Sequence, residues 1–280
     1  MRVTLRGTRG SIATPGPDTV RYGGNTACVD ILGDAGTVLV LDAGTGIRQL
    51  NAALPRHLKR IDILLTHLHM DHIQGLGFFA PLHNPEAEVH IWGPASTMQN
   101  LQARLKRYLS PPLFPVRLSD LACKLTFHEV PCADVDIGEF QVSAALVCHP
   151  GPTVGYRITC PQGGVLTYLP DHEPALGALR FPTLPRQWTS GAALAENASL
   201  LIHDSQYTGA EYAKRQGWGH SAFEQTLAFA TLTEVRRLVP FHHDPEHSDA
   251  QLDQILAEEV QKANPPYQVS AGLEGATFEV

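Results

Sequence analysis

The chain has 280 residues, of which 43% are hydrophobic and 18% charged, a composition that is ordinary for a soluble globular protein with a sizeable core. The formal net charge of −7 argues against a large basic groove for long nucleic acid. No stretch approaches the length of a membrane span, and the N-terminus lacks the apolar segment of a secretory signal. The five cysteines are widely spaced and are expected to be reduced core residues. We therefore expect one cytoplasmic domain over residues 1–280.

The first quarter of the chain predicts strands that surround glycine-rich loops. A hairpin is expected at Gly33–Gly36, and a helix with Ile47, Leu50 and Leu54 on one face follows the second strand of this hairpin. The loop before the hairpin contains Arg21 and Asn25, which could line the mouth of a site. The predicted elements here are strands 2–6, 27–32, 37–41 and 61–65 and a helix over 47–54.

Four side chains that can bind metal follow directly after the apolar strand 61–65. They are His67, His69, Asp71 and His72. Positions two apart in an extended chain point the same way, so His67 and His69 can bind one metal ion together. Asp71 and His72 come after the chain turns and can face a second ion. Imidazole and carboxylate suit zinc and related divalent metals, so a chance cluster is much the weaker interpretation.

The middle of the chain predicts two further strand ends that carry polar side chains. His149 follows a strand and precedes a rigid Pro-Gly-Pro turn, as a third histidine ligand would. Asp171 follows a hairpin, where a single carboxylate could bridge two metals. The proline-rich segment Ser110–Val116 is either a flap or a connector. The predicted elements are strands 88–92, 124–129, 140–147, 153–158 and 164–169 and a basic helix over 95–108.

The last third of the chain again places histidines and carboxylates after apolar strands. His203 and Asp204 follow one predicted strand, and His242, His243 and Asp244 follow the last clear one. Between these strands, His220 precedes a helix. The tail shows little alternation, and Tyr267–Ser270 is expected to form a short edge strand at most. The predicted elements are strands 198–202 and 238–241 and helices over 208–216, 222–231 and 249–263.

The His-x-His-x-Asp-His segment resembles the metal signature of the metallo-β-lactamase superfamily. This resemblance covers most of the chain, from about residue 2 to 250. It implies a four-layer αββα sandwich with two metals at one edge of the packed sheets. It also implies a role for Asp42, in the Leu-Asp-Ala-Gly-Thr-Gly turn, in supporting the site from behind, whereas the alternative is a helix cap. The implied metal ligands are His67, His69, Asp71, His72, His149, Asp171 and His242, with Asp171 bridging.

Two segments after residue 200 resemble the paired motifs of ribonuclease Z and its small phosphodiesterase relatives. Carried over, Asp204 would orient His220, which would protonate the leaving oxygen or hold the phosphate. Asp204 stands where that branch has glutamate, which shortens the reach. In the same alignment His242 rather than His243 is the ligand, and Asp244 takes the place of a serine. His172, which stands where many relatives have a small residue, has no assigned role and could touch substrate.

These features predict a hydrolase with two divalent metal ions, zinc first and manganese or iron as alternatives, whose bridging hydroxide attacks a small or cyclic phosphodiester. Residues 151–171 leave no room for the arm with which ribonuclease Z grips transfer RNA, and Arg157 is a candidate phosphate contact. Alternatives are a ribonuclease Z-like nuclease on short RNA ends, a lactone or thioester hydrolase that would not need the Asp204–His220 pair, and a non-catalytic sensor. The sequence leaves a homodimer open.

Overall fold

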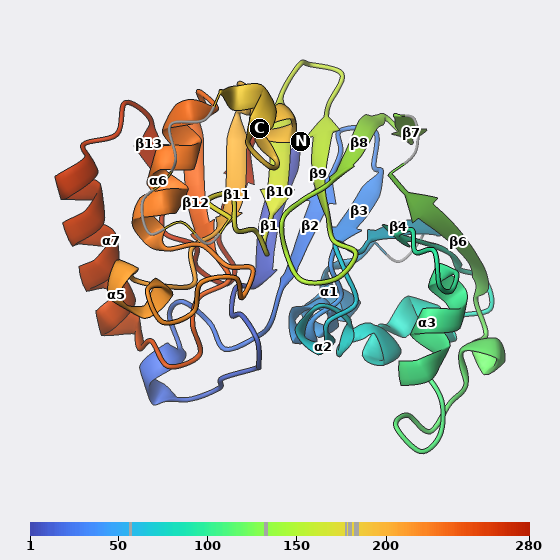
Figure 1. Ribbon diagram of the computed structural model, residues 1–280. Helices are drawn as coiled ribbons and strands as arrows, with labels where there is room; N and C mark the ends of the chain where they lie inside the picture. The colour runs from blue at the N-terminus through green and yellow to red at the C-terminus, as the bar shows by residue number, and fades with distance from the viewer. Residues whose placement is uncertain (56–57, 132–133, 177, 179–180, 182–184) are drawn as a thin grey trace.

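The computed structural model describes residues 1–55, 58–131, 134–176, 178, 181 and 185–280. Within these residues two mixed sheets of seven strands face each other, with helices on both outer sides (Figure 1). This is the four-layer αββα sandwich that the sequence predicts. None of the helices in the described parts of the chain is both long and apolar enough to cross a membrane.

The first sheet is built from the N-terminal half of the chain and one strand from the C-terminal end. Its first four strands in spatial order pair antiparallel, and its last four pair parallel. In spatial order the strands are β14 (Thr277–Glu279), β1 (Arg2–Gly7), β2 (Cys28–Leu32), β3 (Val38–Leu41), β4 (Arg60–Leu64), β5 (Glu88–Pro94) and β6 (Lys124–Val130).

The second sheet comes from the C-terminal half and repeats this mixture of pairings. Strands β10 to β13 pair parallel with one another, and strands β7 to β10 pair antiparallel, so β10 has one neighbour of each kind. In spatial order the strands are β13 (Gln268–Val269), β12 (Arg237–Phe241), β11 (Leu200–Asp204), β10 (Val165–Leu169), β9 (Val154–Thr159), β8 (Phe140–Leu146) and β7 (Val135–Ile137).

Helices cover the outer face of each sheet, so most strands are buried on both faces. Helices α5, α6 and α7 lie on one flank of the molecule and α3 lies on the other (Figure 1). The first sheet is covered by α1 (Leu50–Ala53), α2 (Met70–Ile73) and α3 (Leu101–Tyr108), and the second by α4 (Ala192–Ala195), α6 (Phe223–Leu232) and α7 (Asp249–Ala263). In the short helix α5 (Gly209–Tyr212), Tyr212 packs with Tyr207 and Ala222.

The strand alternation divides the apolar side chains between the layers. In β4, Ile61 and Ile63 pack toward the helices, whereas Leu64 joins the core between the sheets. Tyr156 and Tyr168 from the second sheet fill the same central core. Fully burying one such side chain contributes roughly 1.5–3 kcal/mol, so the three apolar layers fix which strand ends meet at the sheet edge.

Several predicted helices are shorter in the structure than the sequence indicates. The helix expected over 95–108 begins only at Leu101, because the Asn100 side chain accepts a hydrogen bond from the Ala103 amide and caps it there. The helix expected over 47–54 is a 3-10 turn (Thr45–Gln49) followed by α1. The helix expected over 208–216 ends at Tyr212. Strands β7 and β14 were not predicted.

Candidate metal centre and active site

The side chains that the sequence singles out meet at one edge of the sandwich. The segment after β4 carries His67 to His72, and α2 turns the chain so that Asp71 and His72 face inward. Strand β10 leads to Asp171 and β12 leads to His242. The carboxyl ends of parallel strands share one edge of a sheet, which is where such folds place their sites.

Three histidines form the first group of this cluster. The ligand-capable atoms of His67, His69 and His149 all lie within 4.8 Å of one another. The closest pair is His69 Nδ1 and His149 Nε2, at 3.2 Å. His67 Nε2 is buried and has no hydrogen-bond partner among the described residues. A buried nitrogen without a partner is costly unless a ligand or metal satisfies it.

The second group combines two carboxylates with two histidines: Asp71, His72, Asp171 and His242. His242 Nε2 lies 3.1 Å from Asp71 Oδ2, and His72 Nε2 lies 2.9 Å from Asp171 Oδ1. His242 has a φ of 60°, in the left-handed region, so its backbone is strained where its ring enters the cluster. All four side chains are buried.

The two oxygens of Asp171 face the two groups separately. Oδ2 lies 3.7 Å from His67 Nε2 and 3.6 Å from His149 Nε2. Oδ1 lies 2.9 Å from His72 Nε2 and 3.4 Å from His242 Nε2, and it has no hydrogen-bond donor among the described residues. This orientation fits a carboxylate between two cations.

The outer nitrogens of three cluster histidines are held by acceptors. His72 Nδ1 donates to Asp42 Oδ2 at 2.8 Å, His149 Nδ1 to the Gly219 carbonyl at 2.8 Å, and His242 Nδ1 to Gln206 Oε1 at 3.0 Å. These bonds leave each Nε2 lone pair facing the cluster, as is usual for metal-binding histidines. With the two unpartnered buried atoms, they show that the residues present fit two divalent metal ions.

Asp42 supports the cluster and does not cap the following helical turn. It accepts hydrogen bonds from the amide and hydroxyl of Thr66, from His72 and from the Tyr168 hydroxyl. The 3-10 turn after it begins behind Gly44 without a side-chain cap.

Burial and charge set the protonation states of the cluster. Burial lowers the pKa of His67 well below its usual range, and burial also lowers the pKa of His149, which favours the neutral imidazole that binds metal. Burial opposes ionisation of Asp171, but His242 and His72 hold the pKa of its carboxyl well below the usual range.

His220 and Asp204 lie against this cluster as a hydrogen-bonded pair. His220 Nδ1 is 2.7 Å from Asp204 Oδ2 and 3.9 Å from Asp171 Oδ2. Burial opposes protonation of His220, but the charge of Asp204 raises the pKa of the imidazole to about 9. Asp204 also accepts hydrogen bonds from the amides of Gln206 and Ser221. The aspartate therefore reaches the histidine despite its shorter side chain.

Three residues suggested by the sequence have bonding partners outside the metal cluster. Arg21 is paired with Asp253 in α7, and Asn25 bonds to Glu274. Arg157 donates to the carbonyls of Leu194 and Glu196. Strand-end position and charge do not reveal such tertiary partners.

The remaining unassigned side chains are structural. His172 is buried and bonds to His203 and Ser190, so it does not line the opening of the site. His243 bonds to the Gly272 carbonyl, and Asp244 accepts from the amide of Glu246. Phe114, in the proline-rich segment, packs against Phe78 with ring centroids 5.6 Å apart.

Three residues at the site carried no recognised signal. The Ser11 amide donates to Asp71 Oδ2 at 2.8 Å, and Gln206 holds His242. Glu173, two residues after Asp171, binds the amides of Gly217 and Gly219. For Gln206 and Glu173, the one sequence feature that could have indicated a role is their position shortly after a strand. Ser11 acts through its backbone amide, so its residue type does not indicate its role.

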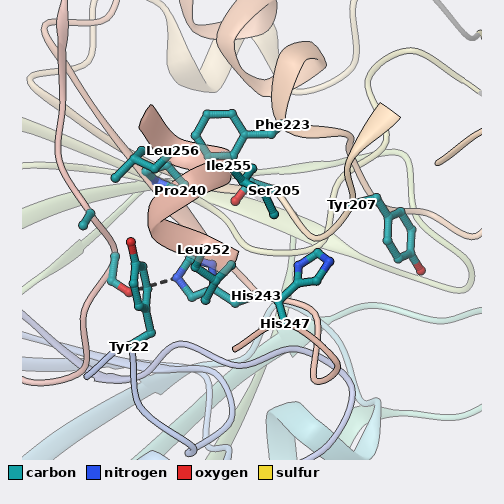
Figure 2. A pocket seen from close by; sticks show the side chains of 12 residues that line it. Tyr22, Ser205, Tyr207, Phe223, Pro240, His243, His247, Leu252, Ile255 and Leu256 are labelled. Atoms are coloured by element: carbon teal, nitrogen blue, oxygen red, sulfur yellow. Dashed lines mark hydrogen bonds between the residues drawn. The ribbon is translucent and has the colours of Figure 1, made fainter. Parts of the chain in front are cut away.

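A separate cavity lies under α7 and does not include any residue of the metal cluster. Figure 2 shows Leu252, Ile255 and Leu256 of α7 around it, with His243 and Tyr22 close by. Its volume is about 10 Å³, roughly enough for one water molecule. A cavity of this volume is too small for a substrate.

The αββα sandwich and its buried histidine–aspartate site define a metallo-hydrolase of the metallo-β-lactamase type. The family model described as "Beta-lactamase superfamily domain" matches residues 37–243. The chain belongs to this superfamily, in the branch that contains ribonuclease Z.

Curated relatives and solved structures agree with this assignment. Ribonuclease Z of Thermococcus gammatolerans is 28% identical over 250 residues, which cover 74% of this chain and 75% of that protein. Ribonuclease Z of Thermococcus kodakarensis is 30% identical over 246 residues, with the same coverage.

Solved structures with little sequence identity share the fold over the whole chain. The metallo-beta-lactamase fold protein YhfI from Bacillus subtilis has a TM-score of 0.71 at 17% identity and covers 100% of this chain and 98% of its own. Human tRNase Z, short form, has a TM-score of 0.68 at 22% identity, with 100% and 99% covered. A diphosphatase from the PhnP family has a TM-score of 0.68 at 17% identity, with 100% and 98% covered.

Proposed function

We propose that this chain is a di-metal phosphodiesterase acting on a small or cyclic phosphodiester. One ion would be held by His67, His69 and His149, and the other by Asp71, His72 and His242. Asp171 would bind both ions. The observation that carries the proposal is the Asp204–His220 pair, 2.7 Å between Nδ1 and Oδ2, because acyl hydrolases of this superfamily do not need it. A phosphodiester with an alkoxide leaving group does need a proton donor.

The residues around the metals have separable roles. Two bound divalent ions supply Lewis acidity and a hydroxide nucleophile near neutral pH. Asp71, fixed by the Ser11 amide, orients the attacking oxygen from one side. His220 donates its Nδ1 proton to Asp204, so its Nε2–H is the one available to the leaving oxygen. The charge of Asp204 favours this doubly protonated, donating state.

Two features of the chain favour a small substrate. Strands β9 and β10 are joined by the short turn 160–164, which leaves no extended arm in this part of the fold. The formal net charge of −7 also disfavours a long polyanion. The similarity to ribonuclease Z over three quarters of those proteins supports a second candidate, a nuclease on short RNA ends.

The test compares two leaving groups in four proteins of known metal content. The proteins are the wild type, His220→Ala, Asp204→Asn and a control, His128→Ala, whose ring stacks on Trp92 away from the cluster. The substrates are bis(p-nitrophenyl) phosphate and adenosine 2′,3′-cyclic phosphate. Loss of a general acid should lower kcat on the alkoxide ester by roughly 10²–10⁴-fold, and much less on the p-nitrophenyl ester, whose leaving anion needs little protonation.

Other outcomes would redirect the proposal. Equal losses on both esters would remove His220 as the proton donor. If the wild type cleaves neither ester but opens lactones or thioesters, the phosphodiesterase proposal is wrong. Faster cleavage of a short RNA end than of either small ester would favour the nuclease.

A further inference from the structure

Glu173 fixes a turn that lies directly against the metal cluster. Its buried carboxylate accepts hydrogen bonds from the Gly217 amide at 2.9 Å, the Gly219 amide at 2.8 Å and the Tyr212 hydroxyl at 2.8 Å. No cation pairs with this carboxylate in the described part of the chain. Bonds from charged acceptors to backbone amides are among the stronger hydrogen bonds, so the turn is firmly held.

The turn is also fixed against His149. The Gly219 carbonyl accepts from His149 Nδ1 at 2.8 Å. A Cβ atom at Gly219 would lie 2.4 Å from that nitrogen and 2.2 Å from Pro150 Cδ, so only glycine permits this approach. Gly217 and Gly219 both have positive φ, 79° and 90°, which glycine adopts without strain. The residue between them therefore has a defined place beside the site.

That residue is Trp218, and its indole is exposed to solvent. The side chain is 61% exposed, and no hydrogen bond or ring contact of the indole exists within the described residues. Trp92, by contrast, is buried, donates to Asp62 and stacks on His128. An exposed large aromatic ring on a firmly held turn is a common form of a recognition residue.

Two more exposed apolar side chains adjoin residues of the cluster. Met70, next to His69, is 50% exposed, and Ile12, next to Ser11, is 61% exposed. Trp218, Met70 and Ile12 thus occupy three separate segments that each contact the metal cluster. Ligand sites commonly combine such apolar walls with a few convergent polar groups.

We propose that Trp218 binds a planar aromatic ring of the substrate, a nucleobase or an aryl ester, by stacking. This inference rests on the proposed phosphodiesterase function and narrows its substrate class. Gly219, the next residue, bonds to the His149 ring, and the indole would extend from this turn to a substituent on a phosphate bound at the cluster. None of the three exposed side chains carries a charge, so each suits contact with the apolar face of a ring.

Binding of phosphate monoesters to the metal-loaded protein tests this inference by calorimetry. The ligands are adenosine 5′-monophosphate, phenyl phosphate and ribose 5-phosphate, which lacks a ring of this kind. The proteins are the wild type, Trp218→Ala, Trp218→Phe and a matched control, Trp188→Ala, since Trp188 is 73% exposed and belongs to the 3-10 turn Arg186–Trp188, outside the cluster residues.

Trp218→Ala should weaken binding of a ring-bearing ligand by roughly 5- to 100-fold and should leave ribose 5-phosphate within about twofold. Trp218→Phe should retain most of the preference, and Trp188→Ala all of it. A loss for the nucleotide alone would assign the ring to a nucleobase, and a loss for phenyl phosphate would place it next to the phosphorus. Unchanged affinity, or an equal loss for ribose 5-phosphate, would overturn the inference.

The two proposals fail in different ways. If the phosphodiesterase proposal is wrong, no variant hydrolyses a phosphodiester, whatever the monoesters bind. If only the Trp218 inference is wrong, turnover persists while the wild type binds ring-bearing monoesters no better than ribose 5-phosphate.

Discussion

Asp171 Oδ1 lies 2.9 Å from His72 Nε2, and this contact joins the two sheets, because His72 follows β4 in the first sheet and Asp171 follows β10 in the second. The cluster therefore connects the two sheets in addition to forming the candidate site. Bound cations would add further attraction between the side chains of the two sheets that meet here. Metal loading and the stability of the sandwich should therefore be linked.

Removing metal should lower the melting temperature of the wild type. A ligand present at 100 times its Kd stabilises a folded protein by about 2.7 kcal/mol, which corresponds to a shift of roughly 5–10 °C in a chain of this size. Calorimetry before and after chelation measures the shift. Asp171→Ala should show a much smaller response to chelation, and an identical melting temperature for loaded and metal-free wild type would break the predicted linkage.

The substitution Asp42→Asn should weaken metal binding although residue 42 is not one of the proposed metal ligands. The neutral amide could no longer accept all the bonds from Thr66, His72 and Tyr168, so a buried donor would lose its partner. The expected cost is about 2–4 kcal/mol in the free energy of unfolding and about 10–100-fold in metal affinity. Denaturant unfolding and competition with a chelating dye measure these two losses, and unchanged metal affinity would show that Asp42 does not orient His72.

Gly10→Ala should displace His242. A Cβ atom at Gly10 would lie 2.4 Å from His242 Nδ1 and 2.6 Å from its Cε1, so the ring must move. We expect metal affinity to fall about 10-fold or more. The matched control is Gly16→Ala, where the nearest atom is 3.9 Å away and the backbone is extended. Equal metal affinity in both variants would mean that the His242 ring has room to adjust.

Acid should destabilise the fold through His203 before it protonates most carboxylates. Burial lowers the pKa of His203 to about 4, below the ordinary value of about 6.5. Between these values the unfolded chain binds the additional proton, so the contribution of His203 to stability is complete above pH 6.5 and is lost as the pH falls toward 4. The expected loss is about 3 kcal/mol. His172, whose pKa is also lowered by burial, faces His203 at 2.9 Å and should add to the slope.

The measurement is urea unfolding of the wild type and His203→Gln at pH 7 and pH 4.5. The variant should be less stable at pH 7, because it loses bonds to the Asp204 carbonyl and His172, but its stability should depend less on pH. Parallel pH profiles for the two proteins would exclude His203 as the source of the acid sensitivity.

The parts of the fold that the sequence could predict are those with a local cause. Strands such as 37–41 and 198–202 are apolar runs long enough to be buried on both faces, and the structure contains both as β3 and β11. The His67–His72 segment concentrates four side chains that can bind metal within six residues, so the cluster around it could be anticipated. His149, Asp171 and His242 each stand directly after such a run.

The features that escaped prediction depend on partners far away in the chain. Strand β14 has little apolar alternation and forms because Thr277–Glu279 pairs with β1. Arg21 pairs with Asp253, and Arg157 donates to two backbone carbonyls. The residues that flank each arginine in the sequence do not indicate these partners. Glu173 becomes important only because the Gly217–Gly219 turn folds over it. Local pattern therefore predicted the side chains that meet in the cluster but not the bonds that hold them.

The most direct test of the central claim is metal content measured together with hydrolysis of bis(p-nitrophenyl) phosphate, in the wild type and in Asp171→Ala. We expect two divalent ions per chain and turnover in the wild type, loss of both after chelation, recovery on adding zinc or manganese, and fewer ions with little turnover in Asp171→Ala. Full turnover by the metal-free wild type, or by Asp171→Ala, would contradict the claim.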